Sequence, residues 1–195
     1  MIINPGEINR LIRHRRSLYP AQYSGEVIDD AIIHQLTENA NWAPTHGLTE
    51  PWRFVVFKGE GLQQLARFQS ELYEEVTKAK GTFSEEKKKD LASKPLLASH
   101  VIAIGMKRDP RGKIPEIEEV EAVACAVQNM YLTASAYGLG AYWGSGGVTY
   151  WDQAKAFFGL EQQDKLLGFF YLGVPKTAWP EGKRGPAEQK VRWVV

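Results

Sequence analysis

The sequence predicts an α+β fold, and three observations support this prediction. Apolar runs with strand character are separated by helical segments of very different length. Several helices precede the second strand, so strands and helices do not alternate as they do in a parallel α/β sheet. No stretch approaches about 18 consecutive apolar residues, which excludes a membrane-spanning helix. We expect one domain over residues 1–195, with a mixed sheet of four to five strands flanked by about five or six helices.

Composition narrows the class of protein. The chain has 24 basic and 23 acidic residues, a net charge of +1, so charge gives no reason to expect nucleic acid or an acidic membrane as a partner. The single cysteine, Cys125, cannot form an internal disulfide, which fits a reducing compartment. The N-terminal stretch lacks a basic region followed by an apolar run, the pattern of a signal peptide. We therefore expect a soluble cytoplasmic protein.

The first elements are marked by caps and apolar spacing. Asn4 caps a short helix that ends in the basic cluster 13–16. Ser24 opens a second helix, with one apolar face, that reaches about Trp42. A buried strand follows at residues 54–57.

The middle of the chain contains one charge-dense segment. A third helix carries apolar residues at helical spacing over 62–76. Residues 78–94 then read as a solvated helical excursion with Ser84 as its cap, and part of a mobile lid is the alternative. Residues 99–106 form the next buried strand.

The longest helix is expected in the second half. It runs from Glu116 to Tyr137, and it is apolar over much of its circumference, which indicates a central position. A strand at 141–143, a short helix at 151–158 and a buried strand at 166–172 follow.

The tail is expected to depend on contacts made elsewhere. From Trp179 onward it is basic and rich in proline and glycine. Its last residues, 191–195, have strand propensity but no following element with which to pair. We expect this last piece to lie against a folded surface of this chain or of a partner.

Several kinds of chemistry are excluded by absent motifs. No phosphate-binding loop of the G-x-x-x-x-G-K-[ST] type occurs, and no G-x-G-x-x-G follows a strand. The histidines and the one cysteine show no metal-ligand spacing. We predict no metal site and no catalytic side chain.

Four short segments are suited to hold a ligand. Arg15-Arg16-Ser17 offers the donors that a phosphate monoester needs, although a solvated basic helix end is the alternative. His46 lies in a polar turn, where a surface histidine without function is also common. The glycine-rich step 143–146 lets a flat ligand or a phosphate approach backbone N–H groups, unless it is a plain turn. Residues 183–186 form a second basic patch or a solvated tail.

Taken in order, these segments resemble the nitroreductase family of FMN-dependent enzymes, most closely its small NAD(P)H nitroreductase-like members. The matching motifs are R-R-S at 15–17, A-P-T-H-x-x-x-x-P-W-x-F at 43–54, G-x-G-x-x-W-x-S-G at 138–146 and F-x-Y-L-G-x-P at 169–175. The resemblance covers nearly the whole chain.

The resemblance implies a nitroreductase-like fold in an intertwined homodimer with two FMN sites at the subunit interface. It implies that His46 and Glu50 reach FMN across the interface and that residues 191–195 embrace the other subunit. The cofactor-binding set that it implies is Arg15, Arg16, Ser17, His46, Glu50, Trp143, Gly144, Ser145 and Arg184.

The implied activity passes a hydride from NADH or NADPH through flavin N5 to a nitroaromatic, quinone or related small-molecule acceptor, in a ping-pong scheme. We expect no side chain to act as a nucleophile. One of Trp42, Trp52 and Trp143 is expected to provide a stacking wall.

Three residues depart from the family pattern, and two of them, Tyr19 and Glu50, suggest an alternative, an FMN-binding store or sensor protein with little turnover. Tyr19 replaces the lysine or arginine of many members, Glu50 replaces a glutamine, and Gly144 replaces an arginine. A non-flavin interaction module is a third possibility.

Overall fold

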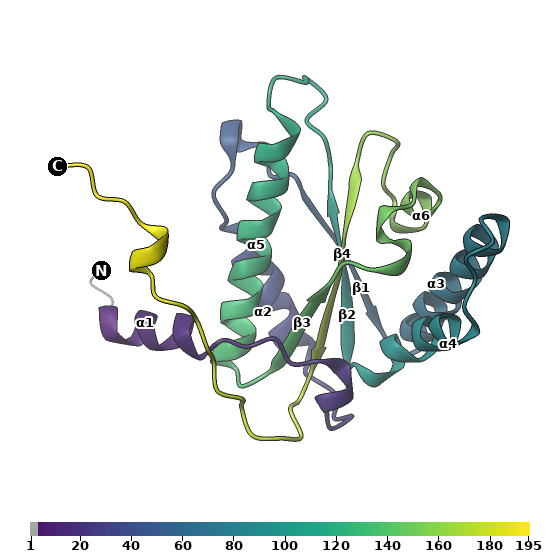
Figure 1. Cartoon of the computed structure of the whole chain (residues 1–195), viewed down its shortest axis with the longest axis horizontal. Coiled ribbons are helices and arrows are strands. Elements are labelled where there is room, and N and C mark those ends of the chain that lie inside the picture. The colour runs from purple at the N-terminus through teal and green to yellow at the C-terminus, as the bar shows by residue number, and fades with distance from the viewer. Residues whose placement is uncertain (1–3) are drawn as a thin grey trace.

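The computed structural model describes residues 4–195 (Figure 1). Met1–Ile3, part of the stretch without signal-peptide features, lie outside the described residues. A four-stranded sheet has the order β1-β2-β4-β3, so β1 and β3 are its edges. The strands are β1 (Trp52–Lys58), β2 (His100–Met106), β3 (Gly140–Gly144) and β4 (Lys165–Gly173).

Helices cover both faces of this sheet. Helices α2 and α5 lie on one face, and α3, α4 and α6 lie on the other, while α1 extends away from the body beside the C-terminal tail (Figure 1). The predicted α+β class is therefore confirmed. The helices are α1 (Pro5–His14), α2 (Asp30–Asn41), α3 (Glu60–Ala79), α4 (Glu85–Ser93), α5 (Glu116–Ala136) and α6 (Asp152–Lys155).

Within residues 4–195 all three strand pairings are antiparallel, whereas we expected a mixed sheet. The reason is the way the helices connect the strands. Between β1 and β2 the chain goes out along α3 and returns along α4, so it re-enters the sheet at the end it left. The single helix α5 connects β2 to β3, and these two parallel strands are separated by β4.

The two-residue period of the strands separates the core into two layers. Ile102 and Ile104 of β2 pack with α5, whereas Val101 and Ala103 pack with α3 on the other face. A bulge in β4, where Gly168 has φ +123°, changes this alternation.

Helix α2 begins later than the sequence indicated. We expected it to open at Ser24, but it starts at Asp30, where the Asp29 side chain accepts from the Ala31 N–H at 2.9 Å. The preceding segment is held by other elements instead. The Ser24 N–H donates to the Val174 carbonyl at 2.8 Å, and this tertiary bond competes with the helix.

The charged segment 78–94 contains helix α4, as its composition predicted. The Ser84 side chain caps α4 by accepting from the Lys87 N–H at 3.3 Å. Glu74 of α3 accepts from Lys78 at 2.6 Å and also pairs with Lys88 of α4. This carboxylate therefore joins the two helices.

Residues 191–195 form no strand, contrary to the expectation from their propensity. Trp193 and Val194 are more than 80% exposed. A strand needs a partner for its backbone groups, and none of the strand pairings among residues 4–195 includes this segment. In the part of the chain that the structure describes, no helix is long and apolar enough to cross a membrane.

The Glu74 contact gives a pH-dependent prediction. Hydrogen bonds from Lys78 and Lys88 lower the pKa of Glu74 from about 4.5 to about 2. Because the folded pKa is depressed, the stabilising effect is present above pH 4.5 and is lost as the pH falls toward 2. We expect Glu74→Gln to reduce the free energy of unfolding near pH 6 and to have little effect near pH 2, measured by urea denaturation.

The neighbouring exposed carboxylate supplies the control. Glu75→Gln removes a charge from the same turn of α3, and Glu75 forms no such ion pair among the described residues. An effect of Glu74→Gln that does not change with pH contradicts the assignment.

Candidate functional site

An extended segment follows α1 and lies along the edge strand β3. Arg15, the C-cap of α1, has φ −51° and ψ 130°, so the helix ends and the chain straightens there. Leu18 is completely buried, and its N–H donates to the Ala141 carbonyl of β3 at 2.9 Å. Arg15, Arg16 and Ser17 are therefore held on one side of this anchor, and Tyr19 on the other.

One tyrosine of α5 connects this segment to β3. The Tyr131 hydroxyl accepts from the Trp143 N–H at 2.6 Å and lies 3.4 Å from the Ser17 hydroxyl. The Arg15 guanidinium lies 4.9 Å from the centre of the Tyr131 ring, which is the geometry of a cation–π contact. Tyr131 thus brings together three residues that the sequence pointed to separately.

In the sequence, Tyr131 is one of the residues on the apolar face of the expected helix 116–137. A tyrosine on a buried face needs a hydrogen-bond partner for its hydroxyl, and this is the signal that could have pointed to it. The identity of that partner depends on the fold and was not predictable from spacing.

The C-terminal tail returns to the end of α1. The Trp179 indole N–H donates to the His14 carbonyl at 2.7 Å, and the two rings stack at 4.9 Å. The Arg16 guanidinium donates to the Pro180 carbonyl at 3.0 Å and to the Arg13 carbonyl at 2.6 Å. These contacts place Arg184 beside residues that precede it by about 170 positions in the sequence.

The result is an arginine pocket of about 480 Å³ at the junction of α1 and the tail. It contains four guanidinium groups and no carboxylate among its lining residues. Guanidinium forks are well suited to bind phosphate oxygens. The lining residues are Ile12, Arg13, Arg15, Arg16, Gly182 and Arg184.

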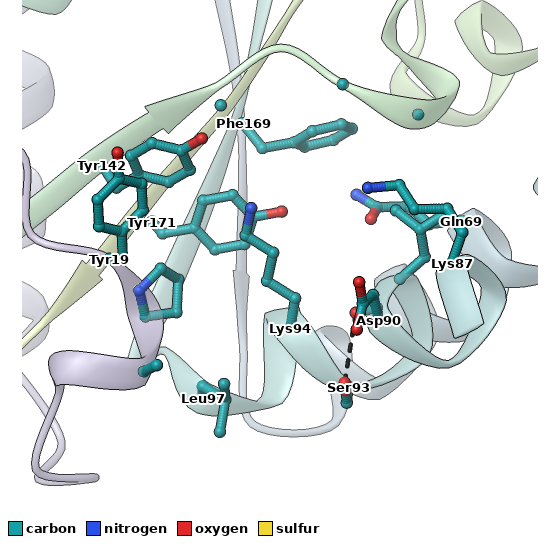
Figure 2. A pocket seen from close by; sticks show the side chains of 16 residues that line it. Tyr19, Gln69, Lys87, Asp90, Ser93, Lys94, Leu97, Tyr142, Phe169 and Tyr171 are labelled. Atoms are coloured by element: carbon teal, nitrogen blue, oxygen red, sulfur yellow. Dashed lines mark hydrogen bonds between the residues drawn. The ribbon is translucent and has the colours of Figure 1, made fainter.

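A second cavity begins where the extended segment ends at Tyr19. This aromatic pocket, of about 380 Å³, lies between the sheet and the α3–α4 pair (Figure 2). Its volume is in the range of ligand sites. Its aromatic walls are Tyr19, Tyr142, Phe169 and Tyr171, and Gln69, Lys87, Asp90, Lys94 and Gly144 also line it.

At the end of β3, the backbone at Gly144 lines the aromatic pocket, whereas the Trp143 ring does not. The Trp143 side chain is directed to the α5 side of the sheet, where its indole N–H donates to the Leu167 carbonyl at 3.0 Å. Gly144 is buried, and a Cβ there would lie 2.8 Å from the Tyr142 ring. Ser145, which follows, is exposed.

The three tryptophans among which a stacking wall was expected lie in different surroundings. Trp52 is 6% exposed and belongs with Trp143 to the core layer on the α5 face, because β1 and β3 place both side chains there. Trp42 alone of the three candidates is open to solvent, with 79% of its surface exposed.

The loop that carries His46 and Glu50 lies at the other end of α5. His46 Nδ1 is 2.5 Å from Glu118 in the first turn of α5, and both side chains are partly exposed. Leu48 and Glu50 have φ of +51° and +43°, values that cost free energy in residues other than glycine. The loop is therefore exposed and strained.

The distance along helix α5 shows how far the loop with His46 and Glu50 lies from the segment with Arg15 and Ser17. Glu118, beside His46, precedes Tyr131, beside Arg15 and Ser17, by thirteen residues. At 1.5 Å per residue this is roughly 20 Å along the helix. Within one chain, His46 and Glu50 are thus far from the arginine pocket (Figure 1).

The positions of the two pockets indicate the class of protein, because they show what kind of ligand it can bind. An arginine pocket and an aromatic pocket lie at the two ends of one extended segment beside an edge strand. This arrangement fits a ligand that combines a phosphate group with a flat ring system.

Comparisons with known proteins agree with this class. The profile of the Nitroreductase family matches residues 12–174. The Escherichia coli (strain K12) protein "Putative NAD(P)H nitroreductase YdjA" is 36% identical over 135 residues, which cover 69% of this chain and 70% of that protein. The chain belongs to the nitroreductase family.

Solved structures share the fold over the full length. A "Nitroreductase-like Family Protein" from Bacillus cereus has a TM-score of 0.81 at 28% identity, covering 100% of this chain and 99% of that chain. The FMN-dependent nitroreductase NfnB from Mycobacterium smegmatis, solved with NADPH, has a TM-score of 0.73 at 18% identity, covering 97% and 99%. The predicted nitroreductase-like fold is confirmed.

The role of Tyr131 can be tested by removing its hydroxyl. Tyr131→Phe leaves the Trp143 N–H without its acceptor and releases Ser17, while the ring stays in the core. An unpaired, largely buried N–H costs about 1–3 kcal/mol, so we expect a loss of that size in the free energy of unfolding. Urea denaturation measures it.

Tyr137→Phe is the matched control, because Tyr137 is 51% exposed at the end of the same helix. Equal stability of the Tyr131→Phe variant and the unsubstituted protein contradicts the connecting role.

Proposed function

We propose that the chain is an FMN-dependent oxidoreductase that passes a hydride from NADH or NADPH to a nitroaromatic, quinone or related acceptor. The observation that carries this proposal is the pair of pockets joined by the segment Arg15–Tyr19, in a chain of the nitroreductase family. The similar fold of an FMN-dependent nitroreductase solved with NADPH supports it.

The residues present fit FMN. Arg15, Arg16 and Arg184 line a pocket without acidic residues, which suits the phosphate. Arg16 already donates to three backbone carbonyls, so we assign it mainly to positioning the tail and assign the phosphate contacts to Arg15 and Arg184. The ring system is assigned to the end of the aromatic pocket beside Tyr19 and Gly144, where Gly144 leaves room for close approach of the backbone.

When bound, FMN supplies the hydride chemistry. The chain contributes binding and orientation, and no nucleophilic side chain is required. Ser17, Tyr131 and the Trp143 backbone keep the segment in place between the two pockets. The donor and the acceptor are proposed to use one cleft in turn, which is the ping-pong scheme.

We further propose that each site is completed by a second copy of this single-domain chain. His46 and Glu50 lie roughly 20 Å along α5 from the arginine pocket, and their loop is exposed. A second subunit therefore brings its loop to the flavin site of the first. The exposed apolar tail residues 191–195 are proposed to lie on that subunit.

A store or sensor protein with little turnover is the second candidate, since Tyr19 lines the aromatic pocket where many family members carry a cation. Adding NADPH or NADH to the yellow protein under argon distinguishes the two candidates. We expect rapid bleaching near 450 nm because the nicotinamide reduces the flavin. A yellow protein that does not bleach supports the store or sensor, and a protein that stays colourless with added FMN contradicts both.

The ping-pong scheme is tested in the same preparation. Varying donor and acceptor concentrations in steady state should give parallel double-reciprocal lines. Intersecting lines contradict sequential use of one cleft.

The arginine pocket is tested by separating FMN from riboflavin, which lacks the phosphate. We expect Arg184→Gln to weaken FMN binding roughly 10- to 100-fold, because a hydrogen bond to a charged group is lost, and to leave riboflavin binding unchanged. Quenching of flavin fluorescence measures both affinities.

Arg10→Gln is the matched control, since Arg10 is exposed on α1, lies outside the pocket and forms an ion pair with Glu7 at 4.0 Å. Unchanged FMN affinity in the Arg184→Gln variant contradicts the phosphate assignment.

A further inference from the structure

The far side of the aromatic pocket contains a polar group without a partner. Gln69 of α3 is 1% exposed, and its Nε2 forms no hydrogen bond of normal geometry within the described residues. Burial raises the pKa of the Tyr171 phenol, and the Gln69 side chain lies near enough to that hydroxyl to lower this pKa in part. Its amide faces the cavity near Tyr171 (Figure 2). A buried amide left unpaired costs free energy, so a protein rarely keeps one where an apolar side chain would fit. The donor points to a ligand that carries an acceptor atom.

A cation lies on the adjacent wall of the same pocket. Lys94 Nζ lies 4.7 Å from the centre of the Tyr142 ring and 5.1 Å from that of Tyr171. Burial lowers the pKa of Lys94, nearby Lys87 lowers it further, and Asp90 opposes them only in part. The ammonium group is therefore incompletely compensated, and an anion in the pocket stabilises it.

The other residues that line the aromatic pocket indicate what kind of anion fits there. Tyr19, Tyr142, Phe169 and Tyr171 supply aromatic surfaces that favour contact with a flat ring. Two lysines against one aspartate leave the lining with an excess of positive charge. The pocket therefore combines the features that recognise an aromatic ring with an anionic oxygen group at its edge.

We propose that the aromatic pocket includes an acceptor subsite that selects aromatic acceptors bearing a carboxylate. Lys94 pairs with the carboxylate, the Gln69 amide donates to one of its oxygens, and the tyrosine walls contact the ring. This inference rests on the proposed oxidoreductase function and adds a substrate class to it. Neither Gln69 nor Lys94 belongs to the residues that the family resemblance pointed to.

The flavin ring itself also presents oxygen atoms on a flat edge, so the test must separate the two ligands. We use Gln69→Met and Lys94→Met, which keep side-chain length and remove the donor or the charge. Lys89→Met is the control, because Lys89 is exposed on α4 and does not line the pocket. Three quantities are measured: benzoate affinity of the oxidised holoenzyme by calorimetry, FMN affinity, and kcat/KM for 4-nitrobenzoate against 4-nitrobenzyl alcohol.

We expect both variants to weaken benzoate binding and to lower the nitrobenzoate preference by about tenfold or more, while FMN affinity stays constant. Because Gln69 Nε2 forms no hydrogen bond of normal geometry among the described residues, Gln69→Met should melt at the same temperature as the unsubstituted protein or higher. Unchanged benzoate affinity and preference overturn the proposal. Weakened FMN binding with equal losses on both acceptors also overturns it, because the wall formed by Gln69 and Lys94 then serves the flavin.

Failure of the proposed function gives a different result. If the protein does not turn over, benzoate binding to the oxidised protein still reports on Gln69 and Lys94. Benzoate affinity that depends on both residues in an inactive protein supports the carboxylate site while contradicting the oxidoreductase activity. Benzoate binding that is equal in all variants overturns the site whatever the activity.

Discussion

The candidate site depends on how Leu18 is fixed against the edge strand β3. Its side chain is completely buried, its N–H donates to Ala141, and its carbonyl accepts from the Tyr23 hydroxyl at 2.7 Å. The backbone N–H and carbonyl of Leu18 are thus both hydrogen-bonded, while its apolar side chain is buried. The arginine pocket lies before this residue and the aromatic pocket after it, so the spacing between the two pockets follows from this anchor.

The anchor itself requires two glycines. The Tyr23 ring lies over the ends of β3 and β4, where a Cβ would come within 2.8 Å of it at Gly140 and within 2.3 Å at Gly173. Burial raises the pKa of the Tyr23 phenol, which keeps the hydroxyl protonated as the donor to Leu18. These glycines belong to two of the motifs that indicated the family, and in this chain they make room for a tyrosine.

Local patterns predicted most of the elements, whereas the site depends on contacts that sequence spacing does not encode. Apolar alternation located the strands, and the small-residue pattern located α5. The start of α2 was misplaced because the Ser24 N–H donates to the Val174 carbonyl, just beyond the end of β4, and not within a helix. Tyr131 fits the apolar face of its helix and Gln69 carries no signal in the sequence, because the hydrogen-bond partner of Tyr131 and the pocket that Gln69 lines appear only in the fold.

The length of α5 separates the candidate residues and so bears on assembly. One end holds the strained loop with His46 and Glu50, beside which Trp42 and Leu48 expose apolar surface. The other end holds the arginine pocket and the tail, whose last residues are also apolar and exposed. Strained backbone persists only where surrounding structure or a partner fixes it, and clustered exposed apolar residues mark interaction surfaces. A rigid helix keeps its two ends apart, and for this reason we propose that the loop serves the flavin of a second subunit. The proposed dimer follows from this geometric limit.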